Sequence, residues 1–401
     1  MKLWTLLVVA TVVVASPAGG TPPQYQIYDI GVAQSGDSAS EAFGVSTAAI
    51  VVGRSLRNGG SQAFSWTRGG GIVALPNLAG TNYCTATGAK NYDGIAVVGT
   101  CSTDASGTDR VPVVWENGTV ARLPLPPGAT VGEANSIGPR NIPVGSAGTG
   151  TLQRAAIYSR TSASFITQTT SIGSYFLTAL GISEFNRVVG QGVDPNNQAR
   201  NVGIAHDPST GETLEVGVLP GMNGAIVYGI ANYGQFLAGA SMLDHGPPRP
   251  FVRSEYGALV AIPLVPGTDR GVARAVNSFG WTVGTDSSDF TVPFLYDATT
   301  TYRLADLIPS GSGWDLATNT SSSAVGITDG RVIVGTGIFN GQRRAFAMLP
   351  PQPPPSCTVC HKGYATLTYP CGSAEYARHR DHGDTQGPCR LQAAPEPATA
   401  R

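Results

Sequence analysis

An internal repeat constrains the fold of this chain more than any other feature of its sequence. A short apolar pattern that ends in aliphatic-Val-Gly, or a close variant, recurs seven times at intervals that average about 47 residues. The glycines that end it are Gly53, Gly99, Gly145, Gly190, Gly239, Gly284 and Gly335. A period of about 40–50 residues is typical of β-propellers, in which each repeat builds one four-stranded sheet, or blade.

Each repeat contains the patterns of several strands. A small-x-Gly-aliphatic strand, such as Ala42 to Val45, precedes the repeat glycine, and an apolar patch such as Ala63 to Trp66 follows it. A further strand ends near Leu-Pro, as at Leu75 and Pro76. Such a sheet cannot bury its two apolar faces alone, whereas a ring of blades covers them all. We therefore predict an all-β, seven-bladed β-propeller of four-stranded blades over residues 24–350.

The two ends of the repeat region predict how the ring closes. The seventh repeat stops after its third strand, at Met348 to Pro350. The segment from Tyr25 to Gly31 resembles the fourth strand expected at Tyr302 to Ile308. We expect this N-terminal segment to complete the last blade. The alternative, an open solenoid of hairpins, needs capping repeats, and the sequence shows none.

The first residues predict export. Lys2 precedes an almost wholly apolar run, Leu3 to Val14, which is shorter than the roughly 20 residues that span a bilayer. Small residues follow it, and this order is typical of a secretory signal peptide over residues 1–18, cleaved after Ala15 or Ala18. We expect a secreted, cell-surface or periplasmic protein, with no membrane span in the mature chain.

Composition and motifs narrow the function. The formal net charge is −1, only 13% of residues are charged, and no basic patch of the kind used for nucleic acid is present. The chain lacks a Gly-x-Ser-x-Gly elbow, a His-Glu-x-x-His pair and a Walker A loop. We therefore favour a binding or structural module for an extracellular protein or polysaccharide over an enzyme. The alternative is a secreted polysaccharide hydrolase or lyase with acidic residues at the mouth of the channel. The oligomeric state is left open.

The repeat also resembles a known family. Its pattern is similar to the HAF-type extracellular repeat family of bacteria, which reads roughly A-x-G-I-N-x-x-G-x-x-V-G, then H-A-F-x-W, then a Leu-rich strand. The resemblance covers Tyr25 to Pro350, is clear in repeats one, five, six and seven, and is weaker in repeat three. Gln62 and Arg344 stand where the family's naming His is expected. The resemblance implies a propeller-like fold and export, and it implies no activity.

Six cysteines suggest disulfides in an exported chain. Cys84 and Cys101 lie equally far from the turn expected at Tyr92 and Asp93 in the second repeat. They therefore face each other across a strand pair, within bridging distance, and we predict a disulfide between them.

The C-terminal part has a different composition. A Pro-rich linker over residues 351–356 leads to a Cys/His-rich module over residues 357–389, and we expect a disordered end over 390–401. The candidate ligand or disulfide residues of the module are Cys357, Cys360, His361, Cys371, His379, His382 and Cys389.

Three interpretations of this module are open. Cys357, Cys360 and His361 form a Cys-x-x-Cys-His motif of c-type haem attachment, in which His379 or His382 would be the second axial ligand. Cys357, Cys360, His379 and His382 could instead bind zinc. The third interpretation is a disulfide-stapled module. The segment from Cys360 to Cys389 also resembles a short terminal motif of exported bacterial proteins, which favours zinc or disulfides over haem and implies no function.

Overall fold

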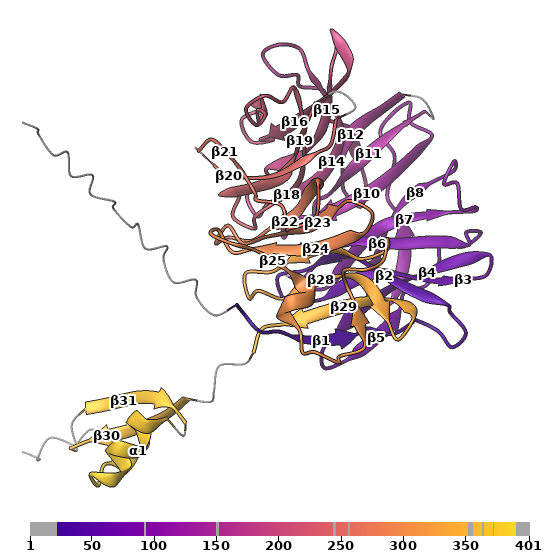
Figure 1. Cartoon of the computed structure of the whole chain (residues 1–401). Helices are drawn as coiled ribbons and strands as arrows, with labels where there is room; N and C mark the ends of the chain where they lie inside the picture. The colour runs from indigo at the N-terminus through magenta and orange to yellow at the C-terminus, as the bar shows by residue number, and fades with distance from the viewer. Residues whose placement is uncertain are drawn as a thin grey trace, which may run out of the picture. The chain divides into compact units, whose positions relative to one another are not determined.

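The structure, a computed structural model, describes residues 22–91, 94–149, 152–243, 246–255, 257–351, 356–362, 365–371 and 373–389. It divides the chain into two compact units, Met1–Pro350 and Pro351–Arg401 (Figure 1). The expected signal peptide, linker residues 352–355 and the C-terminal end at 390–401 lie outside the described residues. No helix in the described ranges is long and apolar enough to cross a membrane.

The first unit is all-β and consists of consecutive antiparallel strand groups. Groups 1 to 3 are β2 (Ala39–Val45), β3 (Val51–Arg57), β4 (Gly60–Thr67) and β5 (Gly71–Ala74); β6 (Tyr83–Lys90), β7 (Ala96–Ser102), β8 (Val111–Glu116) and β9 (Thr119–Arg122); β10 (Val131–Ile137), β11 (Pro143–Thr149), β12 (Leu152–Tyr158) and β13 (Ala163–Phe165). Groups 4 to 6 are β14 (Tyr175–Ile182), β15 (Val188–Asp194), β16 (Asn197–His206) and β17 (Thr213–Glu215); β18 (Gly224–Ile230), β19 (Phe236–Met242), β20 (Arg249–Ser254) and β21 (Leu259–Ala261); β22 (Arg270–Val276), β23 (Thr282–Ser287), β24 (Thr291–Tyr296) and β25 (Thr301–Arg303). One parallel pair, Ser61 with Tyr83, joins groups 1 and 2 into an eight-stranded sheet.

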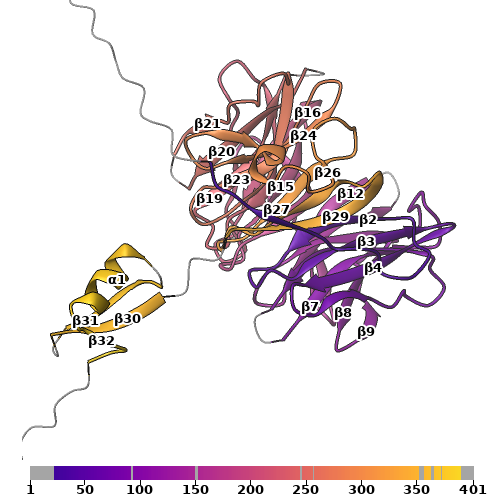
Figure 2. The ribbon, with the colours of Figure 1, turned by 60° about the horizontal axis from the view of Figure 1, so that its bottom comes forward.

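The last group combines both ends of the unit. It contains β27 (Ser323–Ile327), β28 (Ile333–Phe339), β29 (Gln342–Leu349), β1 (Gln26–Asp29) and the short β26 (Trp314–Asp315). β1 pairs antiparallel with β29, from Gln26 opposite Leu349 to Asp29 opposite Phe346 (Figure 2). This is the pairing that the repeat pattern predicts. β26, which pairs with the far end of β28, was not predicted.

The first strands of the groups contact one another in chain order. β2 contacts β6, β6 contacts β10, and the series continues through β14, β18 and β22 to β27. β27 in turn contacts β2, so the series returns to its starting strand. Apolar side chains fill the space between neighbouring groups. Between groups 3 and 4, for example, Val144 and Ala155 pack with Phe176, Val188 and Ile204.

The repeat glycines lie opposite a β-bulge in the first strand of each group. A Cβ atom at any of the seven positions would lie 1.9–2.2 Å from a carbonyl oxygen of that strand. In several groups it would also meet a buried phenylalanine of the third strand, as at Gly239, where Cζ of Phe251 would be 2.6 Å away. Only glycine fits without displacing the strands, which explains why the repeat is recognised by this residue.

The fourth strand expected at Tyr302 to Ile308 is shorter than predicted. β25 ends at Arg303, and a 3-10 helix, η1 (Leu304–Leu307), follows it. The 3-10 geometry places residues three apart on one side, and both Leu304 and Leu307 are fully buried. The backbone N–H of Tyr25 donates to the carbonyl of Leu307, so this helix also anchors the start of β1.

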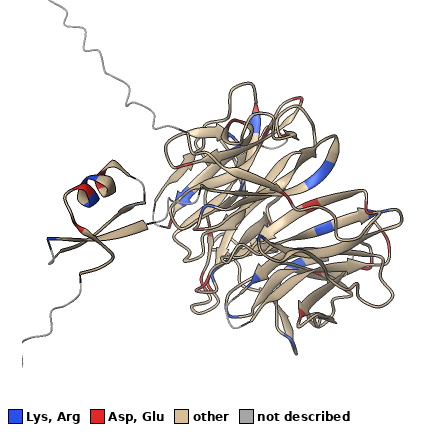
Figure 3. Ribbon diagram, turned by 90° about the horizontal axis from the view of Figure 1, so that it is seen from below, with Lys and Arg blue, Asp and Glu red and all other residues tan. Residues whose placement is uncertain are grey.

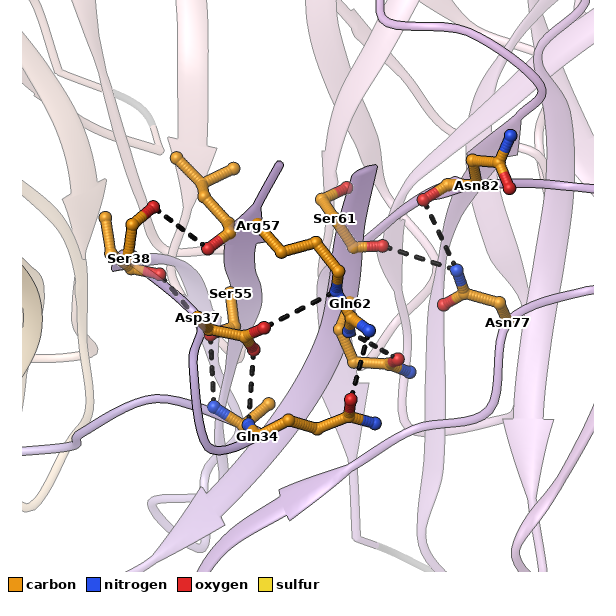
Figure 4. A network of polar contacts seen from close by, with 12 residues as sticks. Gln34, Asp37, Ser38, Ser55, Arg57, Ser61, Gln62, Asn77 and Asn82 are labelled. Atoms are coloured by element: carbon orange, nitrogen blue, oxygen red, sulfur yellow. Dashed lines mark hydrogen bonds and ion pairs between the residues drawn. The ribbon is translucent and has the colours of Figure 1, made fainter. Parts of the chain in front are cut away.

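A polar network holds the connection from β1 to group 1 (Figure 4). The guanidinium of Arg57 donates to the side-chain oxygens of Gln34 and Gln62 and lies 3.4 Å from Asp37. Asp37 also accepts from the backbone N–H of Gln34. Arg57 therefore joins the incoming segment to both β3 and β4, which fixes where β2 begins.

The cysteines of group 2 form a disulfide. Cys84 on β6 pairs with Cys101 on β7, with 4.1 Å between their Cα atoms, and both residues are fully buried. This is the pair that the hairpin register predicts. The register shifts by one residue at the bulge beyond Ala86, closer to the turn, and so leaves the cysteines opposed.

The second unit is a small α/β module. β30 (Ser356–His361) lies between β31 (Ala365–Pro370) and the short β32 (Thr385–Gln386), and α1 (Ala374–Asp381) connects β31 to β32. The Ser373 hydroxyl caps α1 by accepting from the N–H of Tyr376. Disulfides join Cys357 to Cys371 and Cys360 to Cys389.

Candidate functional site

The first strands of the seven groups in the first unit surround one cavity of about 260 Å³. Every first strand contributes lining residues, and so do the turns that follow six of them, all but β14: Ser46 and Thr47, Asn91, Pro139, Asn232, Asn277, and Thr328 with Asp329. The cavity therefore extends to the end of the strand groups where the first strands finish. We call this end the mouth.

The bulges decide which side chains line the cavity. The residue that each bulge inserts lies between the alanine or valine and the small residue of the repeat pattern. These inserted residues are Phe43, Thr87, Asn135, Leu180, Tyr228, Arg274 and Val325, and all of them line the cavity. Bulges are known to redirect a side chain in this way. The variable position of the repeat therefore determines the chemistry of the cavity.

Some of these side chains also connect neighbouring groups. The Thr87 hydroxyl donates to the carbonyl of Ala134 (2.6 Å), and the Asn135 amide donates to the carbonyl of Ala179 (3.0 Å). The Arg274 guanidinium lies 4.4 Å from the ring centroid of Tyr228. The lining is thus a mixture of rings, amides and two cations, Lys90 and the stacked Arg274.

The turns at the mouth are held by bonds from one group to the next. The side-chain amide of Asn277 donates to the carbonyl of Thr328 (3.2 Å). The backbone N–H of Ser278 donates to Asp329 (2.7 Å), and its hydroxyl donates to the same carboxylate (3.0 Å). These bonds fix the turn after β22 against the turn after β27, and the side chains that such turns carry form the rim of the mouth.

Three exposed aromatic side chains occupy the same position in three consecutive turns of this rim. Phe185, Tyr233 and Phe279 are 63%, 51% and 63% exposed. Each directly precedes a residue with positive φ, namely Asn186, Gly234 or Gly280. The ring centroids of Phe185 and Tyr233 are 6.4 Å apart. We call these three residues the aromatic row. Sequence reasoning missed it, although an aromatic residue inside a polar hairpin turn is a visible signal.

Charged groups near the aromatic row have partners. Arg187 forms an ion pair with Glu255 (3.2 Å), and Arg331 lies 4.2 Å from the ring centroid of Trp281. Lys, Arg, Asp and Glu are interspersed along the strands of this unit rather than gathered by sign (Figure 3). The cavity lining beside the rim holds two cations, Lys90 and Arg274, and one carboxylate, Asp329.

In the second unit, the disulfides correct two predictions. Cys357 and Cys360 are bonded to Cys371 and Cys389, so their sulfurs cannot form thioether bonds to haem or serve as thiolate ligands. The c-type haem interpretation and the zinc set that included these cysteines are therefore wrong. His382 follows the last turn of α1 as its C-cap and is exposed.

His361 and His379 instead converge on Asp384, which the sequence analysis did not select. The Nδ1 atoms of the two histidines lie 2.8 and 2.7 Å from Oδ2 of this buried carboxylate. The Lys362 backbone N–H donates to Oδ1 (3.1 Å). Hydrogen bonds from His361, His379 and Lys362 hold the pKa of Asp384 well below its usual range. The His379–Gly383–Asp384 spacing is visible in the sequence, but its convergence with His361 depends on how β30 and α1 pack.

Comparison with known proteins gives structural likenesses alone. No protein-family model matches this chain, and no curated protein does. Virginiamycin B lyase from Staphylococcus aureus is similar at 12% identity and a TM-score of 0.47, over 81% of this chain and 99% of that one. The β-propeller domain of the Trilobed protease from Pyrococcus furiosus is similar at 12% identity and a TM-score of 0.42, over 67% of this chain and 83% of that one. TolB from Acinetobacter baumannii is similar at 10% identity and a TM-score of 0.39, over 73% of this chain and 77% of that one. At these values no ligand or activity is transferred to this chain.

Proposed function

We propose that this chain is an exported protein whose first unit is a seven-bladed β-propeller of the HAF-repeat type. The contact series that returns from β27 to β2 supports a closed ring of seven strand groups. The cavity lined by all seven first strands supports a common axis. The three disulfides fit an oxidising compartment outside the cytoplasm.

Within this frame, the propeller is a binding module for a neutral polysaccharide, which it holds at the mouth. The aromatic row is the observation that carries this proposal. A pyranose ring presents C–H groups of partial positive charge on its faces, and these stack on the electron-rich face of an aromatic ring. Three rings at equivalent positions of consecutive turns suit a ligand that itself repeats.

The polar groups beside the row support a glycan ligand. Asn232 lines the cavity beside the row, and an amide both donates to and accepts from sugar hydroxyls, whereas the buried amide of Asn277 is committed to Thr328, Phe279 and Trp281. The described cavity lining contains one carboxylate, Asp329, which is already held by Ser278. Glycoside hydrolysis generally uses a pair of carboxyl groups, so the geometry supports binding better than turnover.

The test is affinity electrophoresis of the full chain in gels that contain laminarin, xyloglucan, galactomannan or dextran. We expect retardation by at least one of them, and at least a tenfold weaker apparent affinity for Tyr233→Ala/Phe279→Ala. The control is Phe290→Ala, because Phe290 is also exposed (47%) but lies in the β23–β24 turn at the opposite end of the sheets.

Three results would contradict the proposal. If none of the polysaccharides retards the chain, neutral polysaccharides are excluded as the ligand, and a protein partner becomes the better explanation. An equal loss of affinity in the Phe290→Ala control would show that the aromatic row is not the binding surface. Release of new reducing ends or unsaturated products would favour the hydrolase or lyase alternative.

A further inference from the structure

The second unit brings two imidazoles and one carboxylate to a single point. One ring nitrogen of His361, one of His379 and a carboxylate oxygen of Asp384 all lie within 4.8 Å of one another. The two imidazole planes are nearly perpendicular, at 89°, and the Nδ1 atoms of both rings contact the same carboxylate oxygen, Oδ2. Two histidines and one carboxylate are a common donor set for zinc.

The separations suit a small divalent cation. Zn–N bonds of about 2.0–2.1 Å and Zn–O bonds of about 2.0–2.2 Å place adjacent ligand atoms roughly 3–3.4 Å apart. The observed Nδ1 to Oδ2 distances of 2.7 and 2.8 Å need to widen by only a few tenths of an ångström. The side chains of His361 and His379 are 26% and 20% exposed, which leaves an entry path from solvent.

Surrounding contacts orient the donors as they do in metal centres. Tyr369 stacks on the His379 ring, with centroids 5.1 Å apart, and its hydroxyl lies 3.0 Å from Nε2. The Lys362 N–H binds the other oxygen of Asp384 and so directs Oδ2 toward the histidines. The Cys360–Cys389 disulfide fixes the residue next to His361. Such supporting contacts typically tune ligand geometry and affinity.

We propose that His361, His379 and Asp384 form a zinc site in the second unit, with one coordination position open to water or to an outside donor. The cysteines take no part in it. Because all four cysteines of this unit are in disulfides, the site needs no reduced thiol and is compatible with an oxidising compartment. The site is independent of the polysaccharide surface assigned to the propeller.

The test uses the full chain with its disulfides intact, stripped with a chelator and titrated calorimetrically with ZnCl₂. We expect one equivalent to bind with a Kd of micromolar or below. Asp384→Asn and His379→Ala should each weaken binding at least tenfold. His382→Ala is the matched control and should bind like the parent, because His382 is a neighbouring histidine outside the cluster.

Spectroscopy of the Co²⁺-loaded chain supplies a readout that does not depend on variants folding. Visible d–d bands without a thiolate charge-transfer band near the ultraviolet are expected for a His₂Asp donor set. A thiolate band, no saturable Zn²⁺ binding, or a loss in His382→Ala equal to that in His379→Ala would overturn the proposal. In the absence of binding, the three side chains are a hydrogen-bonded cluster alone.

Discussion

Gly239→Ala should destabilise the first unit through one misplaced methyl group. The new Cβ would lie 2.2 Å from the carbonyl oxygen of Ile226 and 2.6 Å from Cζ of Phe251, whose side chain is fully buried. Ordinary contacts begin near 3.4 Å. Neither the backbone of β18 nor the enclosed ring can move by the missing ångström without separating packed strands.

The expected cost follows from overpacking. Inserting a methyl group into a packed core costs about 1–3 kcal/mol, and the lost freedom of the unfolded chain offsets about 0.4–1 kcal/mol of it. This close backbone contact belongs at the upper end, so we expect a net loss of about 2–3 kcal/mol. At roughly 2.1 cal/mol/K of unfolding entropy per residue, a unit of this size should melt roughly 3–4 °C lower.

Calorimetry of the full chain tests this, with Gly69→Ala as the matched control. Gly69 has open space around its missing Cβ and no positive φ, so its variant should melt within about one degree of the parent. A Gly239→Ala variant that melts like the parent, or an equal loss in the control, would refute the packing explanation of the repeat glycines.

Two further predictions concern buried groups. Burial raises the pKa of Asp286 to about 7, so the folded chain keeps a proton that the unfolded chain loses. Stability should therefore fall as pH rises from about 4 to 7, by up to roughly 1.4 kcal/mol per unit, and Asp286→Asn should flatten this slope in melts at pH 4.5 and 7.5; an unchanged slope would count against it. Replacing Cys84 and Cys101 together by serine opens a loop of 17 residues. It should cost about 3 kcal/mol in chemical unfolding, and a loss well under 1 kcal/mol would contradict the predicted contribution of this cross-link.

The sequence predicts the parts of the fold that depend on contacts within one hairpin or one repeat. A glycine is required wherever a bulge presses a carbonyl against the second strand, so the period can be read directly from residues such as Gly53 and Gly335. The opposed positions of Cys84 and Cys101 follow from hairpin symmetry, which is also local. The seventh repeat lacks a fourth strand, and the N-terminal segment carries the pattern of one. The repeat pattern alone therefore predicts that the two combine.

Features that depend on packing between distant segments could not be read in this way. Four cysteines in the second unit allow three pairings, and only the register of β30 against its neighbours selects the observed one. The convergence of His361 with Asp384 needs that same sheet. β26 forms because Trp314 packs on Phe339 and Phe346, and no periodic pattern in the sequence predicts these contacts.

Removal of residues 22–31 tests most directly the central claim that the N-terminal segment closes the ring and so maintains the mouth. This deletion removes the buried Tyr25 and Ile30 and exposes the edge of β29. A chain that lacks 351–401 is the control, since those residues form a separate compact unit. We predict that the N-terminal deletion fails to fold or melts at least ten degrees lower in calorimetry, whereas the control melts within about two degrees of the parent. An N-terminal deletion that melts like the parent would contradict the closed ring.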